Sequence, residues 1–188
     1  DGVEIITDQG SVRASRAVVT LPLGVLQNGD VEFSPALPPA KQDAIRRLQM
    51  GTMNKIALRF GERFWPEWPH YMGRLAEGDE AVVEWWNMAV YSDQPVLLAL
   101  SSGAQARDME RLPEGEVVER LMFDLRHTFG GDIAPPVAAV STRWHGDPFA
   151  RGAYSHVPPG AAMADYDALA TSVEDRLFFA GEATSRQY

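Results

Sequence analysis

The chain has 188 residues, of which 45% are hydrophobic and 23% charged, and this composition predicts a folded globular protein of one large or two small domains. Its formal net charge of −9 argues against a nucleic-acid partner, because binding to a phosphate backbone needs clustered Lys and Arg side chains. The absence of cysteine excludes disulfides, thiolate metal sites and a cysteine nucleophile built from this chain.

The first quarter of the chain predicts two strands and one helix. "VEIIT" and "SVRASRAVVTLP" predict strands on either side of the turn "DQG", and the apolar run "AVVTL" predicts burial on both faces. Pro22 and Gly24 are expected to end the second strand, and "FSPALPPA" is typical of a connector. Apolar residues at helical spacing predict a helix over "KQDAIRRLQM", and Gly51 is expected to end it.

The middle and the end of the chain predict a sheet with flanking helices. Three successive strand candidates, "NKIALRF", "AVVEWWNMAVY" and "PVLLALSS", favour a largely antiparallel sheet. "EGEVVERLMFDLRHTFGG" has an apolar stripe and predicts a helix that ends at Gly130. "VAAVSTRW" predicts a further strand, "HGDPFARGAYSHVPPGA" a loop, and "RLFFAGEA" a short buried strand. We therefore expect a mixed fold of the α+β or α/β class.

Lys55 stands out because it lies in the middle of an otherwise apolar strand candidate. On a strand it would share one face with Ala57 and Arg59, while Ile56 and Leu58 would share the other face. An amphipathic strand with one solvated face explains this pattern, since exposed lysines vastly outnumber functional ones.

Several kinds of chemistry lack a motif in this sequence. His145, Asp147 and His156 occupy one predicted loop, but their spacing matches no zinc motif, and we predict no metal site. A G-x-S-x-G nucleophile elbow is absent, which leaves hydrolase chemistry without support. Neither G-x-G-x-x-G nor a P-loop is present, so this chain does not itself begin a dinucleotide site.

Two segments near the end of the chain are candidates for ligand contact. "LFFAGEAT" is a predicted buried strand that runs into Gly181 and Glu182, where an α/β sheet offers backbone N–H groups and a carboxylate, although ordinary turns share this pattern. "RWHGDPFARGAYS" places Trp144, Phe149 and Tyr154 in a predicted loop. These aromatic side chains either pack down over a core or stack on a flat ligand.

Five segments together resemble the flavin-containing amine oxidase family, which includes polyamine and putrescine oxidases, monoamine oxidases and lysine-specific histone demethylases. They are, in order, "VVTLPLGVL", "FSPALPPAKQDAIRRLQMGTMNKIALRF", "FW", "RWHGDPFARGAYS" and "LFFAGEATSRQY". The resemblance spans essentially the whole chain and implies a substrate domain inserted into a discontinuous FAD-binding domain. Residues 1–30 would be part of the FAD-binding domain, 31–140 the substrate domain and 141–188 a truncated, returning FAD-binding segment.

The resemblance implies which residues contact FAD. The backbone of Val3 would meet the adenine, and Glu182, after Gly181, would hold the ribityl and pyrophosphate region. The adenosine part would be lined by Thr20, Leu21 and Pro22. The family dinucleotide motif is absent, so we expect a fragment that does not retain FAD and is inactive alone.

The aromatic segment receives its roles from the same resemblance. Trp144 and Phe149 would pack around the isoalloxazine ring, and Tyr154 would form one wall of the slot through which the amine approaches. Ala153 stands where monoamine oxidases have a cysteine bonded to the flavin. FAD is therefore expected to bind noncovalently, which favours the polyamine oxidase and demethylase branches.

The implied reaction is oxidation of a C–N bond of an amine to an imine, with a hydride equivalent passing to flavin N5 and O2 becoming H2O2. Lys55 resembles the family lysine that holds a water against flavin N5, so Lys55 and Tyr154 are the candidate catalytic residues. A small cationic amine, preferably a polyamine or diamine, and O2 are the expected partners. The acidic composition is compatible with a cationic substrate.

Two other functions stay open on the sequence. One is a noncatalytic binding or scaffold module, and the other is a relative of the L-amino-acid oxidases, which need an arginine such as Arg59, Arg74 or Arg151 for the substrate carboxylate. "EWWNMAVY" either lines a substrate cavity or packs in a sheet, and packing is favoured because Trp and Tyr suit half-buried strands. No signal peptide or membrane-length apolar run is present, so we expect a cytoplasmic protein without a membrane partner.

Overall fold

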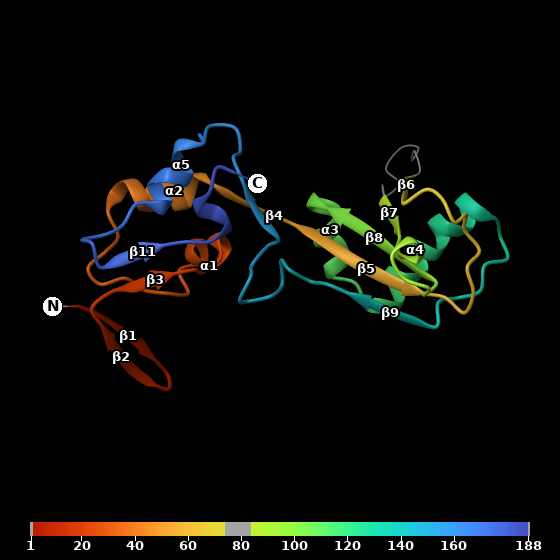
Figure 1. Ribbon diagram of the computed structural model, residues 1–188, viewed down its shortest axis with the longest axis horizontal. Helices are drawn as coiled ribbons and strands as arrows, with labels where there is room; N and C mark the ends of the chain where they lie inside the picture. The colour runs from red at the N-terminus through yellow and green to blue at the C-terminus, as the bar shows by residue number, and fades with distance from the viewer. Residues whose placement is uncertain (1, 74–83, 188) are drawn as a thin grey trace. The chain divides into compact units, whose positions relative to one another are not determined.

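The computed structural model describes residues 2–73 and 84–187, which fall into two compact units (Figure 1). The first unit, called unit 1 below, consists of residues 1–51 and 147–188, and unit 2 is the single segment Thr52–Gly146. The chain thus leaves unit 1 after Gly51 and returns to it at Asp147. Residues 31–51, grouped with the substrate domain in the sequence analysis, lie in unit 1.

Unit 2 is built on a five-stranded sheet with the strand order β6-β7-β8-β5-β9. Every neighbouring pair is antiparallel, which confirms the predicted sheet. A 3-10 helix, η1 (Met88–Val90), follows β7, and residues 81–83 of the predicted strand "AVVEWWNMAVY" lie outside the described residues. The strands are β5 (Met53–Arg59), β6 (Tyr71–Gly73), β7 (Glu84–Asn87), β8 (Val96–Ser102) and β9 (Ala138–Ser141).

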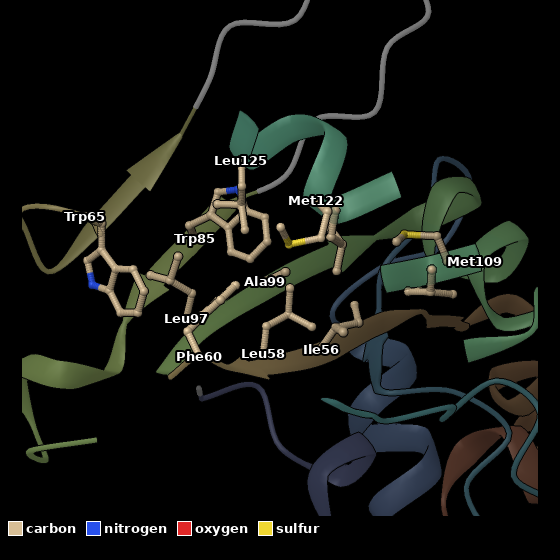
Figure 2. Close-up of a cluster of buried hydrophobic side chains, with 12 residues drawn as sticks. Ile56, Leu58, Phe60, Trp65, Trp85, Leu97, Ala99, Met109, Met122 and Leu125 are labelled. Carbon is tan, nitrogen blue, oxygen red and sulfur yellow. The ribbon is translucent and has the colours of Figure 1, made fainter. Parts of the chain in front are cut away.

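Two helices, α3 (Gly103–Glu110) and α4 (Glu114–Phe129), cover one face of this sheet. The apolar stripe of α4 supplies Met122 and Leu125, which pack on Leu58 of β5 and Leu97 of β8 (Figure 2). Trp85 of β7 is 2% exposed in the same core, and its Nε1–H donates to Asp124 Oδ2 at 2.7 Å. Burial of these side chains at roughly 2 kcal/mol each gives unit 2 its own core.

Unit 1 combines short strand pairs with three helices. Its strands are β1 (Val3–Thr7), β2 (Gly10–Ala14), β3 (Ala17–Val19), β4 (Gln49–Gly51), β10 (Tyr154–His156) and β11 (Leu177–Phe179). Its helices are α1 (Leu23–Asn28), α2 (Pro39–Arg47) and α5 (Ala164–Ala170), with a 3-10 turn η2 (Glu182–Thr184). β1 and β2 form an antiparallel hairpin, β4 pairs antiparallel with β10, and β3 pairs parallel with β11.

The core of unit 1 lies where α2 and α5 meet β11. Leu48, Tyr166 and Leu169 are at most 1% exposed, and Phe179 of β11 packs against the same cluster. This cluster fixes β11 beneath two helices and thereby fixes the segment that follows it. No helix in residues 2–73 or 84–187 is long and apolar enough to cross a membrane.

Several local expectations for unit 1 were wrong. Val18 in the run "AVVTL" is 62% exposed instead of buried on both faces, because β3 has β11 as its only strand partner in the described chain. The strand does end before Pro22, as predicted, but Gly24 lies inside α1, which begins directly after Pro22. The helix predicted over "KQDAIRRLQM" ends at Arg47, and the following residues form β4. The predicted loop "HGDPFARGAYSHVPPGA" contains β10.

Candidate functional site

The two parallel strands of unit 1 bring predicted cofactor residues together at their carboxyl ends. Ala180 N–H donates to the Val19 carbonyl at 3.0 Å, so Thr20 and Gly181 leave neighbouring strands side by side. Gly181 has φ 121°, a conformation that favours glycine and turns the chain into η2. Leu21 and Pro22 follow Thr20 and lead into α1. In open α/β sheets, this end of parallel strands is where ligands bind.

Glu182 links the end of β11 to strand β10. Its Oε1 accepts hydrogen bonds from the Ser155 backbone N–H and from Ser155 Oγ, both at 2.9 Å. Ser155 is 2% exposed, and its Oγ lies 3.2 Å from the hydroxyl of the fully buried Tyr166. The predicted FAD residue Glu182 is therefore fixed beside Tyr154, the predicted substrate wall. Sequence reasoning missed Ser155, which carries no motif of its own.

Tyr154 lies across Gly51, and the contact requires glycine. The two residues are paired in the β4–β10 ladder, and a Cβ on Gly51 would lie 2.9 Å from Tyr154 Cε2 and 3.1 Å from Cζ. Gly152 has φ 144°, and a Cβ there would lie 2.9 Å from Met50 Cβ. Ala153 N–H donates to the Gly51 carbonyl at 2.9 Å. Two glycines thus let the Tyr154 segment approach β4 closely.

The remaining predicted FAD residues of unit 1, Val3 and Phe149, lie in other parts of the unit. Val3 lies in the β1–β2 hairpin, where it pairs with Ala14. Phe149 is 84% exposed in a turn, and its backbone N–H donates to Asp147 Oδ1 at 2.7 Å. Both keep the roles that the resemblance gives them as predictions.

In unit 2, Lys55 lies on the sheet face opposite the helices. It is exposed, as is Arg59, while Ile56 and Leu58 on the other face are buried, so the predicted alternation is confirmed. Cross-strand pairing places Ala57, Leu98 and Trp86 in one row on the face of Lys55. The row continues to Val140 of β9 and Tyr71 of β6, which are 65% and 62% exposed.

The two tryptophans of "EWWNMAVY" have different environments. Trp85 packs in the core, whereas Trp86 is half-buried on the face that carries Lys55. Trp85 thus confirms the favoured alternative of packing in the sheet, and a role of Trp86 in lining a substrate cavity stays a prediction. The Lys55 face combines this apolar row with the charged side chains of Lys55, Arg59 and Glu84, and the apolar row suits the hydrocarbon part of an amine.

A polar network holds Trp144 next to the strand of Lys55. Asn54, 2% exposed, accepts from Thr142 Oγ1 at 3.1 Å and from the Trp144 backbone N–H at 3.2 Å. The Lys55 N–H donates to Thr142 Oγ1, and the Thr142 N–H donates to the Lys55 carbonyl, both at 2.9 Å. Sequence reasoning missed this network, although a polar Asn54 on the core face of the strand was a usable signal.

Two ion pairs in unit 1 shift carboxyl pKa values. The hydrogen bond from Arg151 lowers the pKa of Asp30, with Arg151 Nη2 3.0 Å from Asp30 Oδ1. The hydrogen bond from Arg47 lowers the pKa of Asp165, with Nε 3.0 Å from Oδ1. Of the three arginines considered for a carboxylate substrate, Arg151 is thus paired with Asp30, Arg59 is exposed on the Lys55 face, and Arg74 lies outside the described residues.

Lys41 is a buried cation in the core of unit 1. It is 2% exposed, its Nζ donates to the carbonyls of Ala168 at 3.2 Å and Leu169 at 2.5 Å, and it lies 3.9 Å from the centre of the Phe179 ring. Burial lowers its pKa to about 8. The ammonium caps the end of α5 and holds this helix to β11.

The residues present fit part of an FAD site. In unit 1, Gly181 and Glu182 supply backbone and a carboxylate at the parallel strand ends, and Phe149 and Tyr154 are 84% and 39% exposed. In unit 2, Trp144 is 41% exposed. The accessible faces of aromatic side chains suit stacking on a flat ring system. Among residues 2–73 and 84–187, no group of three or more His, Asp or Glu side chains is placed to hold a metal ion.

Comparison with known proteins gives a consistent answer over the whole length of the chain. The profile of the family described as flavin containing amine oxidoreductase matches residues 1–188. The chain is 40% identical to a rice protein named lysine-specific histone demethylase 1 homolog 1, and 42% identical to the Arabidopsis thaliana protein of that name, over its full length. It spans 23% of each of these relatives, about a quarter of their length.

Solved structures agree on the fold. A cyclohexylamine oxidase from Brevibacterium oxydans matches 98% of the chain with a TM-score of 0.79 and 23% identity, and the match covers 40% of that protein. A putrescine oxidase bound to putrescine matches 97% of the chain with a TM-score of 0.78 and 19% identity, again over 40% of that protein. At these identities the structural likeness concerns the fold alone. The family profile matches the whole chain, and the chain therefore belongs to the flavin-containing amine oxidoreductase family.

Proposed function

We propose that the protein containing this chain is an FAD-dependent amine oxidase that oxidises a C–N bond of a cationic amine to an imine and passes the electrons to O2, releasing H2O2. The observation that carries the proposal is the hydrogen-bonded connection from Glu182 through Ser155 to the Tyr154 strand. It joins a carboxylate at the carboxyl ends of two parallel strands to an aromatic side chain suited to guide an amine. Family membership supports the same reading.

The proposed roles are those that the family resemblance implies, considered with the environment of each side chain. Glu182, Thr20, Leu21 and Pro22 would hold the adenosine, pyrophosphate and ribityl parts of FAD. When bound, the cofactor supplies an acceptor for a hydride equivalent. Tyr154 would present its ring to the amine, and Ala153 offers no nucleophile, so FAD would bind noncovalently.

Lys55 would place a positive charge where negative charge develops during electron transfer. It is exposed, its backbone is fixed by Thr142, and apolar side chains of the sheet surround it on the same face. The aromatic face of Trp144 would pack on the isoalloxazine ring. These residues would orient the amine and exclude water around it.

For the substrate, the names of the relatives favour an N-methylated lysine side chain over a free polyamine. Relatives that are 40% to 42% identical are named lysine-specific histone demethylases, whereas the putrescine oxidase is 19% identical. Both substrate classes present a cationic amine on an alkyl chain, and the chain's net charge of −9 suits either one.

An amine panel on the full-length protein tests the proposal. We expect the purified protein to carry flavin absorbance and to release H2O2 with a peptide containing N-methylated lysine, with the unmethylated peptide as the control. Putrescine and longer polyamines form the second arm, and their preference over the peptide would assign the substrate to the polyamine class. A folded full-length protein that binds no flavin would make the chain part of a noncatalytic module instead.

A further inference from the structure

We infer that Asn54 and Glu110 are positioning residues that clamp the segment Thr142–Gly146, and with it the Trp144 indole, against the strand that carries Lys55. The inference deepens the proposed function and rests on it, since it assigns a purpose to two side chains to which the family resemblance gave no role. All of the residues concerned lie in unit 2.

The Glu110 carboxylate is the centre of the clamp. Glu110 is the last residue of helix α3. Its Oε1 accepts hydrogen bonds from Asn54 Nδ2 at 2.6 Å and from the His145 N–H at 3.0 Å. Its Oε2 accepts from the Gly146 N–H at 2.8 Å. A Cβ on Gly146 would lie 3.3 Å from Oε2, so glycine leaves room for this close approach. A carboxylate can accept all three hydrogen bonds, whereas a neutral amide would turn an N–H toward one of the donors.

Asn54 completes the clamp from the strand. Its amide donates to Glu110, while its Oδ1 accepts from Thr142 Oγ1 and from the Trp144 N–H. The side chain is 2% exposed, and both its donor and its acceptor are used. Because Asn54 is buried, another conformation of its side chain would leave a buried polar group without a partner, which favours the conformation observed.

Arg143 ties the same segment to the end of α3. Its guanidinium donates to the carbonyls of Glu110 at 3.0 Å and Leu112 at 3.1 Å, just where α3 ends. Three consecutive residues, Arg143, Trp144 and His145, are therefore each tied to Asn54 or to Glu110. The indole is the large apolar side chain of this segment, and it is 41% exposed.

This arrangement predicts a functional effect beyond stability. The backbone of Trp144 is set relative to Lys55 by a short path, from Lys55 to Thr142 and from Asn54 to Trp144. Displacement of a cofactor-facing ring by about 1 Å can slow a reaction by roughly 100-fold. Loosening the clamp should therefore slow flavin reduction even when the protein remains folded.

The test compares four variants of the full-length protein: Glu110→Gln, Asn54→Asp, the double variant, and Glu116→Gln as a control on an exposed glutamate of α4. Asn54→Asp sets two carboxylates against each other across the 2.6 Å contact. In the double variant the new amide on α3 donates to the new carboxylate on β5, so the contact is restored with donor and acceptor exchanged. We expect Glu110→Gln and Asn54→Asp each to slow anaerobic flavin reduction by about 10-fold, and the double variant to recover part of this loss.

Hydrogen exchange gives a readout independent of the flavin. The amides of residues 142–146 should exchange about 10-fold faster in Glu110→Gln than in Glu116→Gln. Thr142→Val, which removes the hydroxyl contacts but keeps the side-chain shape, serves if the charged-site variants fail to fold. Faster exchange together with a reduction rate within about two-fold of the control would assign the clamp to stability alone and overturn the inference.

The two proposals fail in different ways. A wild-type protein without flavin, or with flavin that no amine reduces, contradicts the proposed function. A wild-type protein that is reduced by an amine, with unchanged rates in both single variants, contradicts the clamp and leaves the proposed function intact.

Discussion

The chain has two lysines, and their surroundings differ in every respect. Lys41, in unit 1, is 2% exposed and has its ammonium on two helix-end carbonyls and an aromatic ring. Lys55, in unit 2, is exposed on the open face of a sheet with its backbone fixed on both sides. A buried cation held by carbonyls and a ring acts on the stability of the fold and is closed to a ligand, whereas a rigidly mounted and accessible one is available to a ligand.

The largest expected effect tests whether the exposed Lys55 takes part in the reaction. Lys55→Met in the full-length protein should slow flavin reduction or reoxidation by about 100-fold or more, because the charge near the developing anion is lost. Stability should change by under about 0.5 kcal/mol, as for other exposed positions. Stopped-flow absorbance separates the two half-reactions, and Arg59→Met, on the same face of β5, is the matched control. Unchanged rates in both half-reactions would make Lys55 an ordinary surface residue.

Lys41 should behave in the opposite way, through stability and pH. Its pKa is lowered to about 8, so between about pH 8 and 10.5 the unfolded chain carries the proton that the folded protein has lost. Stability then rises with pH in this window, and the unfolding free energy of wild type minus that of Lys41→Met should increase by about 2 kcal/mol. The charged neighbours on α2 and α5 have partners of their own: Arg46 pairs with Asp43, Arg47 with Asp165, and Asp167 with Arg186, which follows η2.

Urea unfolding at pH 7, 9 and 10.5 measures this difference. At pH 7 the oxidation rate of folded Lys41→Met should stay within about two-fold of wild type. A large loss of oxidation rate in Lys41→Met without a loss of stability would contradict the assignment of Lys41 to stability and of Lys55 to the reaction.

Gly51 lies between the two lysines in the sequence and beneath Tyr154, so a substitution there tests the substrate wall separately from either lysine. Gly51→Ala puts a methyl group 2.9 Å from the Tyr154 ring, and the ring must move. We expect amine oxidation to fall by about 10-fold with little change in flavin content. Gly61→Ala is the control, because a Cβ there meets nothing within 4 Å. Equal rates in the two variants would remove Tyr154 from the substrate wall.

The smallest expected effect concerns the other link between α2 and α5. The Arg47 hydrogen bond lowers the pKa of Asp165, so its contribution is present at pH 7 and is lost as the pH falls through that lowered pKa. Asp165→Asn should cost about 1 kcal/mol at pH 7, limited by the partial exposure of Arg47, and the cost should shrink in acid. Asp108→Asn, in an exposed pair with Arg111, is the control, and an equal cost would contradict the role of burial.

The sequence predicted elements whose pattern is local. The alternation around Lys55 predicted β5, and the apolar stripe of "EGEVVERLMFDLRHTFGG" predicted α4 to its end at Phe129. It did not predict β10, which has only three residues and pairs with β4 about one hundred residues earlier. The apolar run around Val18 was predicted to be buried because apolar residues favour the interior. Composition does not indicate which part of the protein would cover such a run.

In the candidate site too, some residues could be predicted from the sequence and others could not. Resemblance supplied Lys55, Tyr154 and Glu182, whose roles remain predictions, while Ser155 and Glu110 became visible only through their contacts. A serine or a glutamate is common at the surface, so its residue type alone predicts nothing. The hydrogen-bond partners, all distant in sequence, carry the information.

The order in which the two units are completed has a consequence for synthesis of the protein. Unit 2 is one continuous segment, so every strand of its sheet is available once Gly146 has left the ribosome. Unit 1 must wait for its second half, since Ala17 pairs with Leu177 and Gly51 with Tyr154. Until then α2 presents an apolar surface that lacks α5, and a nascent chain in that state is a natural client for chaperones.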